Sequence, residues 1–109
     1  MDVNSVLIAA LDTYSLDLRN HFKGDTAPIE NAISKCKDYL SHNTVTTDWV
    51  KRNWAIMSPA VKAHRKYLVD DIHHARIIED KEALKKLQAK YYILSPYIEL
   101  FKTFPKFLK

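Results

Sequence analysis

Residues 84–101 read LKKLQAKYYILSPYIELF, and this stretch carries the clearest structural signal in the chain. Large apolar side chains recur in it at spacings of three and four, at Leu84, Leu87, Tyr91, Leu94, Ile98 and Phe101. Because an α-helix turns once in 3.6 residues, this spacing places them all on one side of a helix. The stretch therefore predicts a long amphipathic helix, and Ser95-Pro96 leaves the phase of its apolar stripe unchanged.

A second apolar stripe precedes this helix, at Val61, His64, Leu68, Ile72 and Ala75. At about 100° per residue, it is rotated by roughly 100° from the stripe that begins at Leu84, so one straight helix cannot bury both. A break near Glu79-Asp80 resolves the conflict, and Asp80 is a suitable residue to cap the following helix.

Three further breaks divide the rest of the chain. Gly24 is the only glycine and follows an apolar stripe that begins at Val3. It is therefore predicted to end the first helix by adopting the left-handed backbone conformation. The polar loop Ser41–Thr47 ends a second predicted helix, whose first turn contains Pro28. Ser58-Pro59 predicts a further helix start or a kink.

The predicted fold class is all-α, a compact bundle of four to six helices that forms a single domain over residues 1–109. Hydrophobic residues make up 47% and charged residues 28% of the chain, a balance that excludes intrinsic disorder. The single cysteine, Cys36, excludes an internal disulfide. No apolar run approaches the ~18 residues of a membrane span, and the N-terminus lacks a secretory signal. We therefore expect a cytoplasmic protein.

The charge of the chain is unevenly distributed. Residues 1–30 carry a net charge of −3, residues 31–60 of +2 and residues 61–109 of +5, for a total of +4. Pairs four residues apart predict local neutralisation of Lys66 by Asp70, of Arg76 by Asp80 and of Lys86 by Glu82.

The basic C-terminal half is predicted to contact nucleic acid, because cations bind phosphates and an exposed aromatic ring stacks on a base. Its cations without a predicted partner in the same helix are Lys62, Arg65, Lys85 and Lys90. The predicted contact residues are Lys51, Arg52, Lys62, Arg65, Lys66, Arg76, Lys85, Lys90 and Tyr92. We accordingly predict a non-enzymatic accessory subunit that contacts nucleic acid or a nucleoprotein complex. A solvated face that only keeps the protein soluble would give the same pattern.

The main alternative is a protein-binding module of the immunity or inhibitor type. It would bind its partner through exposed aromatic side chains and the C-terminal tail, using Trp49, Trp54, Phe104 and Phe107. An anionic membrane surface is a further partner for the tail, and the sequence leaves a homo-oligomer open.

Catalytic and metal sites are not predicted. Asp70, His73 and His74 have the spacing of metal ligands on a helix, but no second helix offers a matching pair. His64 and Cys36 lie on apolar stripes and are expected to be core residues. One glycine leaves no phosphate-binding loop, so we expect no enzyme activity and no cofactor. A metal-dependent helical enzyme centred on Asp70, His73 and His74 is a third alternative.

In size, helicity and mild basicity the chain is similar to the small helical subunits of CRISPR effector complexes. That resemblance implies a non-catalytic protein that lines a nucleic-acid path. In the same general character it is similar to the four-helix immunity proteins of bacteriocin producers and to phage-encoded inhibitors of host proteins. These resemblances rest on the whole chain rather than on matched residues, so none assigns a role to a residue.

Overall fold

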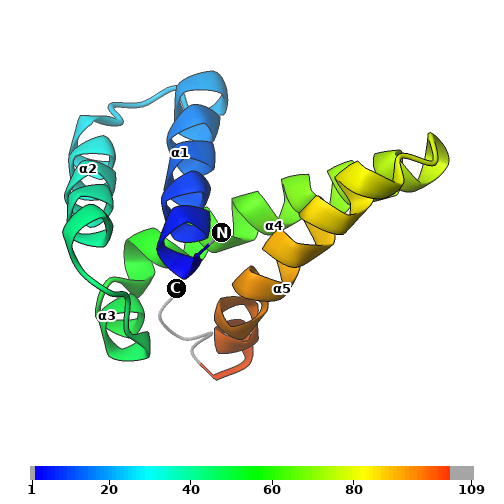
Figure 1. The fold of residues 1–109 in the computed structure, drawn as a ribbon. Coiled ribbons are helices and arrows are strands. Elements are labelled where there is room, and N and C mark those ends of the chain that lie inside the picture. Colours follow the sequence, from blue (N-terminus) through cyan, green and yellow to red (C-terminus); the bar gives the residue numbers. More distant parts are fainter. Residues whose placement is uncertain (1, 104–109) are drawn as a thin grey trace.

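The computed structural model describes residues 2–103 and is helical almost throughout (Figure 1). Its five helices are α1 (Val3–His21), α2 (Ala27–His42), α3 (Thr47–Arg52), α4 (Trp54–Ile77) and α5 (Lys81–Thr103). No strand occurs among the described residues. The prediction of an all-α bundle of four to six helices is confirmed. None of the helices in residues 2–103 has the length and apolar character needed to cross a membrane.

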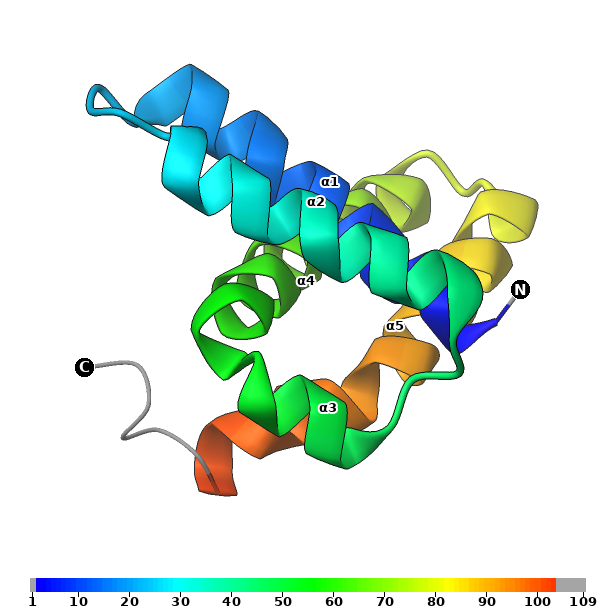
Figure 2. The same ribbon diagram turned by 90° about the vertical axis from the view of Figure 1, so that its left-hand side faces the viewer.

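The first two helices form an antiparallel pair (Figures 1 and 2). The Asp2 carboxylate caps α1 by accepting a hydrogen bond of 2.7 Å from the backbone N–H of Ser5. At the other end, Phe22 takes an extended conformation with φ −97° and stops the helix. The predicted break near Gly24 is confirmed, but the left-handed conformation predicted for Gly24 is wrong: α1 has already ended at His21, and Gly24 has no positive φ.

The helix break that the sequence predicts at Ser58-Pro59 is found closer to the N-terminus. The chain interrupts its helix at Asn53, and α4 then runs from Trp54 through Pro59 without a new start. Proline removes one helical hydrogen bond at this point. Met57, Ala60 and Val61 around it are fully buried, so core packing holds the helix together.

The break predicted near Glu79-Asp80 is confirmed as a tight turn between α4 and α5. The N–H of Glu79 donates to the carbonyl of Arg76 at 3.2 Å, and the N–H of Asp80 donates to that of Ala75 at 3.0 Å. These two bonds form a Schellman motif, which requires a left-handed residue at Glu79, and its φ is 58°. The Asp80 carboxylate then caps α5 by accepting from the N–H of Ala83 at 3.0 Å, as predicted.

One hydrophobic core contains residues from all five helices, and α4 packs against both α1 and α5 (Figure 2). Leu7 and Leu11 of α1, Trp54 and Met57 of α4 and Leu94 of α5 are its largest fully buried side chains. The predicted apolar stripe of α5 faces inward, since Leu94 is buried and most of its other members pack against the core. Beyond the core, the far ends of α4 and α5 project as a helical hairpin (Figure 1).

Both tryptophans belong to the core, which corrects their assignment as partner-binding residues. Trp54 is 1% exposed and its ring packs against Phe101 with centroids 5.1 Å apart. Trp49 is 7% exposed and stacks on Tyr39 at 4.7 Å. Their large apolar surface is already covered within the chain. The other two residues of that prediction, Phe104 and Phe107, lie outside the described residues.

Candidate nucleic-acid interface

One side of α4 carries a row of exposed Lys, Arg and His side chains, which we call the basic stripe. It consists of Lys62, Arg65, Lys66, His73 and Arg76. At about 100° per residue, all five fall within a sector of roughly 100° around the helix axis. Asp70 and Asp71 fall outside that sector, so no carboxylate of α4 interrupts the stripe.

The Lys and Arg side chains of the basic stripe have no ion-pair partner within residues 2–103. The predicted pairs Lys66–Asp70 and Arg76–Asp80 do not form. For Arg76 the cause is visible, because the helix ends at Ile77 and Asp80 turns to cap α5. The third predicted pair, Glu82–Lys86, is present at 3.6 Å.

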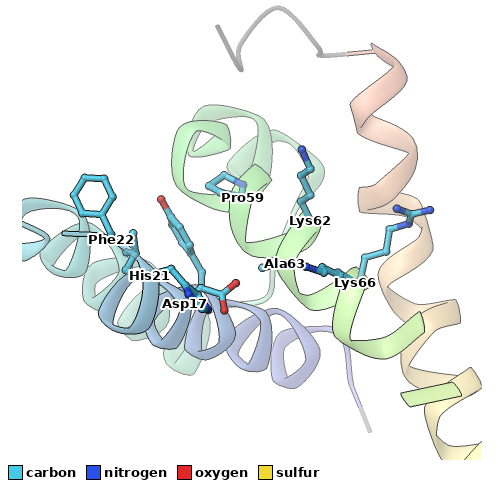
Figure 3. Close-up of a pocket in the computed structure, with 10 residues that line it drawn as sticks. Asp17, His21, Phe22, Pro59, Lys62, Ala63 and Lys66 are labelled. Carbon is cyan, nitrogen blue, oxygen red and sulfur yellow. The ribbon is translucent and has the colours of Figure 1, made fainter. Parts of the chain in front are cut away.

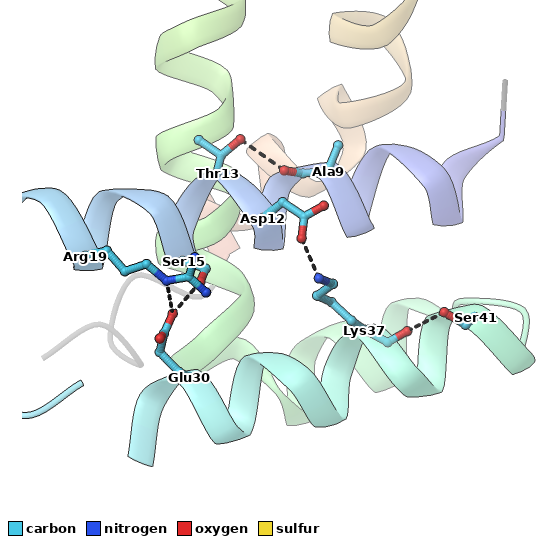
Figure 4. Close-up of polar contacts among 8 residues, drawn as sticks. All are labelled: Ala9, Asp12, Thr13, Ser15, Arg19, Glu30, Lys37 and Ser41. Carbon is cyan, nitrogen blue, oxygen red and sulfur yellow. Dashed lines mark hydrogen bonds and ion pairs between the residues drawn. The ribbon is translucent and has the colours of Figure 1, made fainter. Parts of the chain in front are cut away.

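Paired charges occupy the α1–α2 side of the protein instead (Figure 4). Lys37 of α2 contacts Asp12 of α1. Glu30 accepts a hydrogen bond from the Ser15 hydroxyl and lies 3.4 Å from the Arg19 guanidinium. The Ser15 hydrogen bond and, after it, the Arg19 charge lower the pKa of Glu30. None of these pairs involves a side chain of the basic stripe.

Two hollows follow each other between α4 and α5, and together we call them the α4–α5 groove. The tip hollow has a volume of about 510 Å³ and is lined by Val69, Ile72, His73, Arg76, Gln88, Tyr91, Tyr92 and Ser95. The base hollow has about 290 Å³ and is lined by Lys62, Arg65, Ile98, Glu99, Phe101 and Lys102. Arg65 and Val69 are one helical turn apart, so the basic stripe borders both hollows.

A third hollow, the α1–α4 pocket, lies on the other side of the basic stripe (Figure 3). It has a volume of about 570 Å³, and in Figure 3 Asp17, His21 and Phe22 face Lys62 and Lys66 across it. Tyr67 donates a hydrogen bond of 2.8 Å to Asp17, which raises the pKa of Tyr67. Asp17 places a negative charge at this pocket, whereas no carboxylate is among the residues that line the tip hollow.

The remaining residues of the predicted nucleic-acid contact do not line the groove. Lys51 and Arg52 lie on α3, and Lys51 is partly buried and engaged in an interaction. Lys90 is partly buried and its charge acts on His64, which faces Thr13 of α1. Lys85 is exposed on α5, one turn beyond Gln88 toward the hairpin end. Of the predicted residues, Arg76 and Tyr92 line the tip hollow and Lys62 and Arg65 line the base hollow, whereas Lys66 lines the α1–α4 pocket described above.

Cys36 is a core residue, as the sequence predicts, whereas His64 is only partly buried. The Nδ1 atom of His64 lies 3.1 Å from the Thr13 hydroxyl, which ties α4 to α1. Burial, with the nearby Lys90 charge, lowers the pKa of His64, and the Asp71 charge opposes this shift. Cys36 is buried in the core, and burial raises the pKa of its thiol.

No metal site is apparent in the described part of the chain, where His, Cys, Asp and Glu side chains never gather in groups of three or more with suitable spacing. Asp70, His73 and His74 are all exposed on α4. They find no additional ligand on a neighbouring helix within residues 2–103.

Sequence reasoning missed the apolar part of the groove. Val69 and Ile72 of α4 and Tyr91 of α5 line the tip hollow together with Tyr92. The helical period alone groups Gln88, Tyr92, Ser95, Glu99 and Lys102 on one side of α5. It does not say which side of α4 they meet, because that depends on how the two helices pack.

Comparison with protein-family models, with curated proteins and with solved structures finds no match for this chain. The functional argument therefore rests on the residues and geometry described above.

Proposed function

We propose that this protein is a non-enzymatic accessory subunit that binds the phosphate backbone of a nucleic acid, alone or within a nucleoprotein complex, through the basic stripe of α4. The observation that carries the proposal is the row formed by Lys62, Arg65, Lys66 and Arg76. All four side chains are exposed, share one side of a helix, and lack ion-pair partners among residues 2–103.

The length of the basic stripe suits a nucleic-acid strand. Lys62 and Arg76 are fourteen residues apart on one helix, which at 1.5 Å per residue is about 21 Å. Successive phosphates of one strand in a duplex are about 3.4 Å apart along the axis, so about six fit this length and fewer fit in an extended strand. The stripe therefore matches several consecutive phosphates rather than one isolated anion.

The distribution of charge along the sequence also favours an approach of the nucleic acid to the basic stripe. Residues 1–30, with a net charge of −3, form α1 and the start of α2. Residues 61–109, with a net charge of +5, include most of α4 and all of α5. A polyanion is attracted to the basic side of such a molecule and repelled by its acidic side. This asymmetry brings the nucleic acid toward the stripe before any close contact forms.

The experiment is a salt titration of affinity, by fluorescence anisotropy with a labelled single strand and a labelled duplex. Four phosphate contacts predict that log K falls against log salt with a slope of about −2.8 on the single strand and about −3.6 on the duplex. The variant Lys62→Gln with Arg65→Gln should weaken binding and reduce the single-strand slope by about 1.4.

The matched control is Lys23→Gln with Lys35→Gln, which removes the same formal charge from exposed sites on the α1–α2 side. This variant should keep the wild-type slope. The proposal fails if neither probe binds at about 50 mM salt, where phosphate contacts are strong. It also fails if the two double variants lose affinity equally, because the effect would then come from net charge alone.

A further inference from the structure

We infer that the tip hollow of the α4–α5 groove holds an unpaired nucleobase stacked on Tyr92, so that the nucleic acid recognised is single-stranded. This inference rests on the proposed function and adds a substrate class to it. The phosphates would lie along the basic stripe, and a base would turn from them into the hollow.

Tyr92 has the exposure and freedom that a stacking platform requires. Its side chain is 81% exposed, the largest value among the exposed large hydrophobic residues of the described chain. It has neither a hydrogen bond nor a ring contact within residues 2–103. An aromatic ring in this state offers a face to any base, and such stacking is tolerant of sequence.

The chemistry of the tip hollow suits a base rather than a purely apolar ligand. Val69, Ile72 and Tyr91 provide apolar contact area, while Gln88 and Ser95 provide hydrogen-bonding groups. Its volume of about 510 Å³ is within the range of small-molecule sites. The hollow thus combines an apolar surface with a few polar groups, as sites for planar polar ligands do.

The tip hollow also has a phosphate-binding edge. His73 and Arg76 of the basic stripe line it on the α4 side, and no carboxylate lines it. By contrast, Asp17 lines the α1–α4 pocket, and Glu99 lines the base hollow, where it pairs with Lys102 at 3.2 Å. Of the three hollows beside the basic stripe, the tip hollow therefore repels an anionic strand least.

The stacking of a base on Tyr92 disfavours a duplex as the ligand. The bases of a duplex are already stacked on their neighbours and paired with the opposite strand, so none can enter the tip hollow without leaving the duplex. A single strand has unpaired bases that can turn toward Tyr92. Base binding in the tip hollow therefore requires a single-stranded ligand.

The test compares two single strands with the same number of phosphates, oligothymidylate and a fully abasic strand. The inference predicts that oligothymidylate binds more tightly by about fivefold to 150-fold, the range for one stacked base, with the same salt slope. Tyr92→Ser should abolish this advantage, and Tyr92→Phe should keep it, because phenylalanine retains the ring. Affinity for a duplex, whose bases are already stacked, should not change in Tyr92→Ser.

The matched control is Phe22→Ser, which removes an aromatic ring that is 51% exposed from the α1–α4 pocket. This variant should retain the preference for oligothymidylate. Equal affinity for the two strands, or a preference that survives Tyr92→Ser, overturns the base-binding inference and leaves phosphate binding intact. Failure of both strands to bind while a duplex still binds would overturn the inference alone, and failure of both strands and the duplex would overturn the proposed function.

Discussion

Replacement of Glu79 by glycine should stabilise the protein. Glu79 is the one described non-glycine residue with a positive φ, at 58°, and it occupies the left-handed position of the Schellman motif that joins α4 to α5. A side chain with a Cβ atom is strained there, because the Cβ approaches the following carbonyl oxygen. Glycine has no Cβ and adopts this conformation without that strain.

The magnitude follows from two opposing effects. Removal of the strain that the left-handed conformation imposes on Glu79 should stabilise the folded state by about 1–2 kcal/mol. Glycine also gains conformational freedom in the unfolded chain, which costs about 0.5–1 kcal/mol. We therefore expect Glu79→Gly to raise the free energy of unfolding by about 0.5–1 kcal/mol, which corresponds to an increase in Tm of about 2–8 °C for a small domain.

Urea denaturation followed by circular dichroism measures this change directly. Glu79→Ala is the matched control, since it removes the carboxylate but keeps the Cβ and should leave stability nearly unchanged. Gly24→Ala tests the contrasting position. Its Cβ would lie 2.8 Å from Cε1 of Phe22, whose half-exposed ring can move aside, so the effect should stay within about 0.5 kcal/mol. Equal stability of Glu79→Gly and Glu79→Ala would refute this account of the turn.

Two further predictions concern α4. The hydroxyl of Ser58 is buried and has no hydrogen-bond partner in the described chain, so Ser58→Ala should increase the free energy of unfolding by about 1 kcal/mol, and a decrease would count against this view. Because burial lowers the pKa of His64, the unfolded chain takes up a proton that the folded chain resists, and stability is lost as pH falls below the ordinary histidine value of about 6.5. His64→Asn, which can still bond Thr13, should show a smaller loss of stability on acidification than the wild type, as judged by urea midpoints across pH.

The helical fold was predictable because apolar periodicity reports which side of each helix is buried. The phase change between the stripe that ends at Ala75 and the one that begins at Leu84 located the α4–α5 turn, and Asp80 caps α5 as expected. The signals from single residues were less informative. Glycine permits a left-handed conformation without requiring it, and a proline costs one hydrogen bond that buried neighbours can outweigh.

The candidate site was only half predictable. The basic stripe follows from the spacing of its residues on α4, which the sequence shows directly. The opposite wall of the groove depends on the rotation of α5 about its axis, and that rotation is set by the packing of residues such as Leu94 and Phe101. The predicted pair of Arg76 with Asp80 was wrong because a spacing of four assumes that the helix continues, whereas α4 ends before Asp80. Lys66 and Asp70 both lie on α4 and still do not pair, so helical spacing permits an ion pair without requiring one.

The basic stripe works against the stability of α4, and this is an argument for a role outside folding. Lys62 and Lys66 are four residues apart, and Arg65 is three from Lys62, so like charges are neighbours on the helix surface. Each like-charged pair of this kind costs about 0.2–0.5 kcal/mol. Elsewhere in the described chain opposite charges are paired, either between helices, as Lys37 is with Asp12, or within one helix, as Lys86 is with Glu82. Because neutral side chains at Lys62 and Arg65 would relieve repulsion, loss of nucleic-acid binding in that variant would report a lost contact rather than a lost fold.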